Sequence, residues 1–171
     1  IQLPQMRTSP IPKSGTLRDF LPPFVDEAVK DLRVSEDFIG GTTRGFVDSS
    51  GNITLRENLD SKDKLNTFGH ELAHVLWDKT VTPTQQAAWK KMHNALLETN
   101  PILIRGLSGK KRTPYEEPEH SFADLYGEYV SDPKELKESD PQIYNFMRSI
   151  TSGYEYAKDA KDWMSGFIRR K

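Results

Sequence analysis

The chain has 171 residues, 10% of them aromatic, and a formal net charge of −1, which predicts one folded domain with a hydrophobic core rather than a disordered chain. The near-zero net charge provides no general basic field, so we expect no nucleic acid partner. The sequence contains no cysteine, which excludes disulfide scaffolds and thiol nucleophiles, and no apolar run reaches the length of a membrane-spanning helix.

The N-terminal part of the chain differs in composition from the rest. Residues 1–23 contain five of the eleven prolines and little hydrophobic periodicity, which indicates an extended Pro-rich arm ahead of one domain over residues 24–171. Because the chain begins at Ile1 without a signal or transit pattern, we interpret it as a processed chain or an excised domain. The apolar spacing from Phe24 to Leu32 predicts a short helix.

The next predicted elements are a β-hairpin and a series of helices. The segments 44–48 and 53–56 flank a Ser-Ser-Gly-Asn turn and are expected to pair. Asp60 or Ser61 is expected to cap the first long helix, and Thr84 is expected to cap the second. His93 is expected on an exposed face of the second helix. The predicted helices span about residues 61–78, 84–98 and 118–130, with a fourth from Pro141; a loop covers 101–117, and the tail from Tyr154 is either a docked helix or a frayed end.

The helix over 61–78 carries the pattern His-Glu-x-x-His at His70, Glu71 and His74. Residues four apart lie on one face of a helix, so both imidazoles can bind the same metal ion. Glu71 lies about 100° around the helix from His70, where it can reach a metal-bound water without binding the metal. A metal lowers the pKa of that water and polarises a scissile carbonyl, while Glu71 accepts and relays the proton. The pattern therefore predicts a catalytic zinc site.

Two histidines do not complete a catalytic zinc site, which usually has three protein ligands. The residues after His74 do not continue as x-x-G-x-x-H, so the third ligand must come from another segment. The acidic segment 116–133 is the best candidate, because as a helix it places His120, Asp124 and Glu128 on one face. A second group on that face can hydrogen-bond an imidazole that binds the metal and fix its tautomer.

The strings TFGHELAHVL and FADLYGEYVSDP, with the predicted hairpin, resemble the catalytic domain of anthrax-lethal-factor-like metallopeptidases. This group includes the Pro-Pro endopeptidases and belongs to the gluzincins. Where its downstream motif has a zinc-binding Glu, this chain has His120, so the resemblance implies a three-histidine site with Asp124 behind it. Two alternatives for the third ligand remain. Glu119 could bind the metal if the motif is aligned one residue earlier, or Asp124 could bind it with Glu128 behind it. Tyr115 is the nearest counterpart of the tyrosine with which the family stabilises the oxyanion.

The resemblance implies an α+β, zincin-type domain. We expect a small, mostly antiparallel sheet packed beside the helix that bears His70 and His74, with further helices C-terminal to it. The implied function is that of a zinc-dependent endopeptidase acting on a peptide or protein substrate. Kinship further suggests a secreted or delivered bacterial enzyme, such as a toxin, an effector or a phage-associated domain. The alternative is a catalytically silent zinc-binding module that acts in protein–protein interaction.

Overall fold

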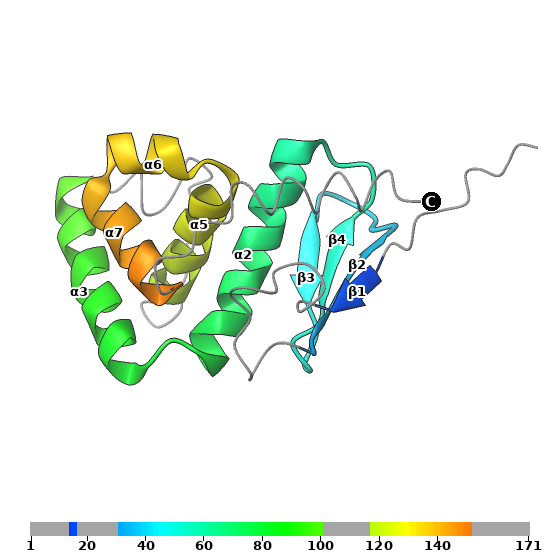
Figure 1. Cartoon of the computed structure of the whole chain (residues 1–171), viewed down its shortest axis with the longest axis horizontal. Helices are drawn as coiled ribbons and strands as arrows, with labels where there is room; N and C mark the ends of the chain where they lie inside the picture. The colour runs from blue at the N-terminus through cyan, green and yellow to red at the C-terminus, as the bar shows by residue number, and fades with distance from the viewer. Residues whose placement is uncertain (1–13, 17–30, 101–116, 152–171) are drawn as a thin grey trace, which may run out of the picture.

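The structure, a computed structural model, describes residues 14–16, 31–100 and 117–151. The long helix α2 (Ser61–Lys79) runs through the middle of the molecule, with a small sheet on one side and the remaining helices on the other (Figure 1). The predicted α+β class is thereby confirmed. The predicted helix from Phe24, the loop that contains Tyr115 and the tail from Tyr154 lie outside the described residues.

The sheet is mixed, with the strand order β1-β2-β4-β3. Its strands are β1 (Ser14–Thr16), β2 (Arg33–Asp37), β3 (Gly45–Val47) and β4 (Ile53–Arg56). The pairs β1–β2 and β3–β4 are antiparallel, whereas β2–β4 is parallel. Neither β1 nor β2 was predicted. In β2 only Val34 is buried among polar neighbours, so the strand shows no alternation of apolar and polar residues.

The predicted hairpin forms between β3 and β4, with Val47 opposite Ile53. Its turn closes through the Asp48 N–H, which donates to the Asn52 carbonyl at 3.0 Å, and Gly51 has a φ of 92° that favours glycine. Strand β3 passes close to α2 at Gly45, where a Cβ atom would lie 2.8 Å from Thr67 Cγ2. The hairpin therefore lies directly against α2, and β3 forms one edge of the described sheet.

Helix α2 begins and packs as predicted. The Asp60 carboxylate accepts a hydrogen bond from the Asp63 N–H at 2.8 Å and caps the helix. The apolar stripe predicted for this helix is buried and comprises Leu65, Phe68, Leu72 and Leu76. On the sheet side, Lys64 forms a buried ion pair with Glu36 of β2 at 2.9 Å. The helix is thus fixed to both halves of the molecule.

Among the described residues, four more helices lie on the other side of α2: α3 (Pro83–Thr99), α5 (Glu117–Ser131), α6 (Pro133–Ser139) and α7 (Pro141–Ile150). The predicted cap of α3 was wrong, because Thr82 and not Thr84 caps it, in a capping box with Gln85. Helix α6 was not predicted, since its seven residues are too few to show an apolar stripe. None of the described helices is both long and apolar enough to cross a membrane.

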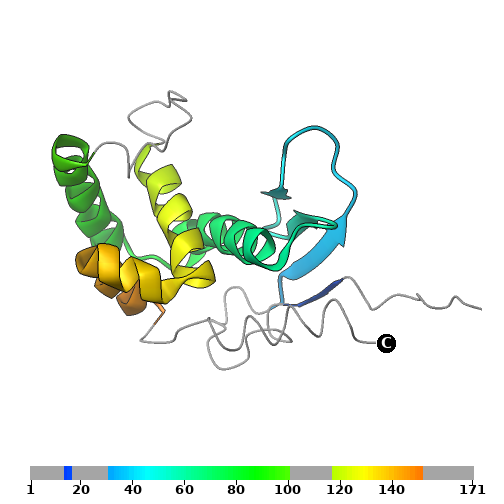
Figure 2. The same ribbon diagram turned by 90° about the horizontal axis from the view of Figure 1, so that it is seen from above.

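Most of the core lies between α2 and these helices, and Val34, Ile53 and Leu55 of the sheet extend it on the other side of α2. Helix α5 crosses α2 in contact with it (Figure 2). Phe122 of α5 is fully buried, with its ring centroid 5.2 Å from that of Trp77 and 5.9 Å from that of Trp89. The prediction that His93 is exposed was wrong, because only 2% of it is accessible. Helix α5 is therefore held between α2 and α3 by a mainly aromatic core.

Candidate metal centre

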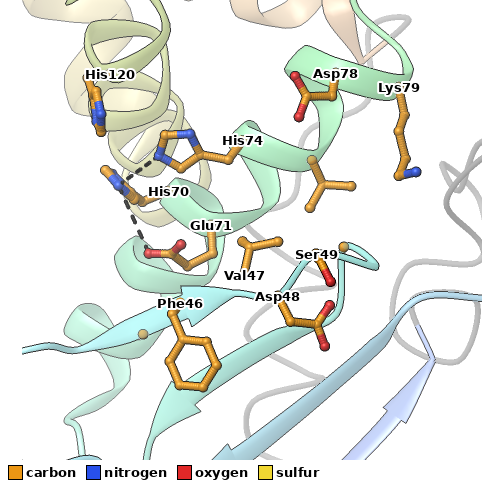
Figure 3. Close-up of a pocket in the computed structure, with 13 residues that line it drawn as sticks. Phe46, Val47, Asp48, Ser49, His70, Glu71, His74, Asp78, Lys79 and His120 are labelled. Atoms are coloured by element: carbon orange, nitrogen blue, oxygen red, sulfur yellow. Dashed lines mark hydrogen bonds and ion pairs between the residues drawn. The ribbon is translucent and has the colours of Figure 1, made fainter. Parts of the chain in front are cut away.

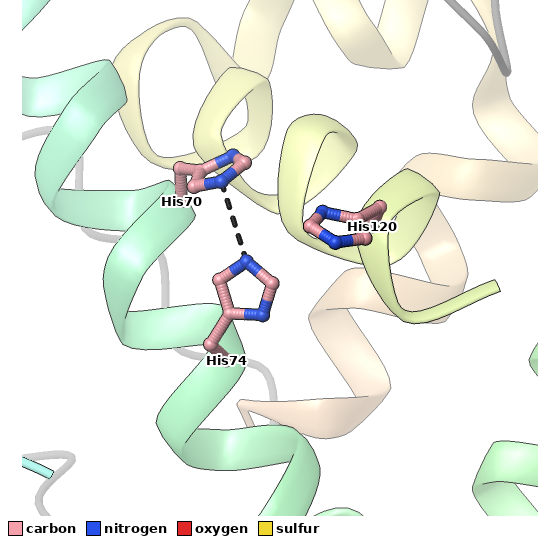
Figure 4. Close-up of side chains that lie close together, drawn as sticks. All are labelled: His70, His74 and His120. Carbon is pink, nitrogen blue, oxygen red and sulfur yellow. Dashed lines mark hydrogen bonds between the residues drawn. The ribbon is translucent and has the colours of Figure 1, made fainter. Parts of the chain in front are cut away.

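Three histidines from two helices converge on one point (Figure 4). His70 and His74 lie one turn apart on α2, and His120 comes from the start of α5. One ring nitrogen of each lies within 4.8 Å of those of the other two. The Nε2 atoms of His70 and His74 are 3.3 Å apart, and the ring centroids of His74 and His120 are 5.2 Å apart. The packing of α5 on α2 thus brings together the three predicted ligands in a group that can hold a metal ion.

Two carboxylates of α5 lie behind the α2 histidines. Glu119 Oε2 is 2.7 Å from His74 Nδ1, and Asp124 Oδ1 is 3.0 Å from His70 Nδ1. An ionised carboxylate only accepts hydrogen bonds, so each Nδ1 carries a proton, and in the neutral imidazole each Nε2 then keeps its lone pair. Both α2 imidazoles are therefore held in the tautomer that binds a metal through Nε2.

The same contacts separate the alternatives for the third ligand. Glu119 and Asp124 contact histidines in this structure and do not belong to the group of ligand atoms that converge. Glu128 lies farther along α5, where its carboxylate accepts a hydrogen bond from the Asn66 side chain at 2.6 Å. Among these candidates, His120 is the residue whose ring nitrogen joins the nitrogens of His70 and His74.

Glu71 lies beside the three histidines. Its Oε2 atom is 4.0 Å from His70 Nε2, and its side chain is only 13% exposed. Burial raises the pKa of the Glu71 carboxyl above its ordinary value, and the neighbouring His70 and His74 partly oppose this shift. A carboxyl so placed can exchange a proton with a molecule bound at the histidines.

The histidines open into a pocket of about 520 Å³ that also contains Glu71 (Figure 3). One wall is made by His70, His74 and His120, and the edge strand β3 with its following turn makes the opposite wall. Phe46 of β3 lines this pocket and is 45% exposed. The far end carries the charged side chains of Asp48, Asp78 and Lys79. The pocket is thus an open groove between a helix and a strand edge.

Two features of the site were not predicted from the sequence. The position of Glu119 behind His74 carries no distinct signal, because acidic residues at the start of a helix are common. The buried position of His93 was missed because Lys90, Lys91 and Asn94 beside it are polar, although His93 lies one turn after the buried Trp89 on the same face of α3. The packing of α5 against α2 places Glu119 beside His74, whereas the packing of α3 against α5 buries His93.

The three histidines fit a transition metal, because imidazole nitrogens bind zinc, copper, iron and nickel well. The paired carboxylates are the partners usual for histidines that bind a metal. Comparisons of the chain with protein-family models, curated proteins and solved structures found no match. The resemblance drawn from the two motifs therefore depends on the residues of those motifs alone.

Proposed function

We propose that this chain is a zinc-dependent endopeptidase of the zincin type. The observation that carries the proposal is the position of Glu71, a buried carboxyl with a raised pKa, beside three converging histidines in an open pocket. A site that only stabilises a fold needs no such carboxyl and no open face, because structural zinc sites are closed by protein ligands.

His70, His74 and His120 would hold the ion. Zinc bound there would polarise the scissile carbonyl and supply a water of lowered pKa. Glu119 and Asp124 would keep His74 and His70 in the tautomer required for binding. The second helix thus contributes one ligand and orients the other two.

Glu71 would act as general base and then as general acid. Its carboxylate accepts the proton of the attacking water and then gives it to the nitrogen of the departing peptide fragment. The side chain of Glu71 is only 13% exposed and its Oε2 atom lies 4.0 Å from His70 Nε2, which would keep it within reach of a water bound at the histidines.

The edge strand β3 would hold the substrate. It has a neighbour on one side only within the described sheet, so an extended peptide can add there through main-chain hydrogen bonds. Because β3 and the three histidines form opposite walls of the pocket, such a peptide would pass directly by Glu71. Two parts of the proposal come from the resemblance alone: the oxyanion role of Tyr115 and the delivery of the enzyme as a bacterial toxin or effector.

The substitution Glu71→Gln tests this proposal. It removes the proton acceptor and keeps the size of the side chain, so we expect a loss of about 10²–10⁴-fold in peptide cleavage with zinc content unchanged. Cleavage of a peptide library and zinc content are measured on both proteins, with Glu98→Gln on the exposed face of α3 as the control. A wild-type chain that binds zinc but cleaves no peptide would support the alternative, a silent zinc-binding module.

A further inference from the structure

A buried polar cluster lies on the side of α5 that faces α3. It consists of Trp89 and His93 from α3 and of Ser121 and the Pro118 carbonyl from α5, and we call it the α5 anchor. His93 Nδ1 lies 2.8 Å from Ser121 Oγ, which donates to the Pro118 carbonyl at 3.1 Å. The Trp89 indole N–H donates to the same carbonyl at 2.8 Å and reaches Ser121 Oγ at 3.2 Å.

The α5 anchor is buried, and all of its hydrogen bonds can form at the same time. Trp89, His93 and Ser121 are at most 2% exposed. A serine hydroxyl has one donor and two acceptor sites. With its proton on the Pro118 carbonyl, the Ser121 hydroxyl accepts from Trp89 and from Nδ1–H of His93, so all of these groups are satisfied at once. Buried groups paired in this way hold a fixed geometry, because breaking any bond leaves a polar atom without water.

The segment that the anchor fixes is the one that completes the metal centre. Pro118 and Ser121 enclose Glu119 and His120 in the sequence. Within the three-histidine group, His120 is the member that does not come from α2, so its distance from His70 and His74 depends on the position of the start of α5. A metal site tolerates errors of only about 0.5 Å in its ligands.

We propose that Ser121 and His93 are positioning residues for the metal centre. By joining the start of α5 to α3, they hold His120 at the third ligand position and Glu119 against His74. Neither Ser121 nor His93 belongs to the group of three histidines that would bind the metal. The inference rests on the metal site of the proposed function and not on its peptidase activity.

Zinc affinity, measured by competition with a chelator, tests the proposal. We expect Ser121→Ala and His93→Leu each to bind zinc about 10–100-fold more weakly than the wild type. His93→Asn keeps an N–H donor near the position of Nδ1 and should restore most of the affinity. Tyr129→Phe is the matched control, because it removes a buried hydrogen bond of the same helix, 3.2 Å from Tyr129 Oη to Thr151 Oγ1, away from the histidines. Its zinc affinity should equal that of the wild type.

Three results would overturn the proposal: wild-type affinity in both Ser121→Ala and His93→Leu, an equal loss in Tyr129→Phe, or a wild-type chain that binds no zinc. Circular dichroism confirms that each variant is folded before its affinity is compared. Failure of the proposed function is a different result. In that case the variants weaken zinc binding as expected, while neither the wild type nor Glu71→Gln cleaves peptides.

Discussion

The two sides of α2 differ in how they are built and in what they contribute. On the helical side, α5 packs on α2 through fully buried aromatic side chains such as Phe122 and Tyr126. On the sheet side, the edge strand β3 leaves Phe46 45% exposed beside a pocket of about 520 Å³. The histidines point toward the junction of the two sides, and the third of them comes from the helical side.

In the proposed function, this difference separates the residues that would hold the ion from those that would bind the substrate. The helical side contains His120, the carboxylates that orient His70 and His74, and the buried cluster behind them. Its close packing suits groups whose positions must be fixed. On the sheet side, β3 has a strand neighbour on one side only within the described sheet, and this edge is where we propose that an extended peptide binds. Substitutions on the two sides should therefore have different effects.

The largest expected difference is between two phenylalanines. Phe122→Ala opens a cavity in the helical core, so we expect the free energy of unfolding to fall by about 3–5 kcal/mol. Phe46→Ala removes a half-exposed side chain and should change it by no more than about 0.5 kcal/mol. Urea denaturation of both variants measures the two values. Equal losses would mean that the sheet side is as closely packed as the helical side.

An intermediate effect is expected at Glu119. The substitution Glu119→Gln keeps an oxygen that can accept from His74 Nδ1–H but removes its charge, so zinc affinity should fall about 10–100-fold. Chelator competition measures the change, and Glu98→Gln again controls for the loss of one acidic group. If Glu119 is instead the third ligand, its substitution will abolish zinc binding and His120→Ala will leave it intact.

The smallest effect concerns Glu128, at the end of α5 away from the histidines. Burial is the main cause that raises the pKa of this carboxyl above its ordinary value, so the folded chain holds its proton to higher pH than the unfolded chain does. The contribution of Glu128 to the free energy of unfolding therefore falls as the pH rises from the pKa of this carboxyl in the unfolded chain to its higher pKa in the folded chain.

Glu128→Gln removes this dependence and keeps an oxygen for the Asn66 amide. Relative to the wild type, the variant should gain stability above that pH window, by up to about 0.5 kcal/mol, and the gain should disappear below it. Melting temperatures of both proteins between pH 4 and pH 7 measure the difference. A gain that does not change with pH would contradict the assignment to ionisation.

The parts of the fold that follow a strong local pattern could be predicted from the sequence. Helix α2 has a regular apolar stripe and an Asp60 cap, and the hairpin has a Gly51 turn between two apolar segments. Strand β2 and helix α6 could not be predicted in this way. Strand β2 has one buried residue among polar ones, and α6 has only seven residues, so neither shows enough hydrophobic periodicity to indicate a strand or a helix.

The residues of the candidate site can likewise be separated into those that a local sequence pattern predicts and those that it does not. His70, Glu71 and His74 follow from a contiguous pattern on one helix. His120 was one of several candidates on one face of the predicted downstream helix, and the resemblance favoured it over the others. The structure brings it to the other two histidines. The contact between Glu119 and His74 depends on the packing of α5 against α2, which no local pattern encodes. The burial of His93 could have been inferred from the sequence, because His93 lies one turn after the buried Trp89 on the same face of α3.

The zinc content of the wild-type chain and of His120→Ala at neutral pH tests the central claim most directly. Asp78→Ala, an exposed side chain of the same pocket, is the matched control. The three-histidine site predicts one zinc per chain in the wild type and in the control, with loss or marked weakening in His120→Ala. Zinc bound as tightly by His120→Ala as by the wild type, or a wild-type chain that binds no zinc, would contradict it.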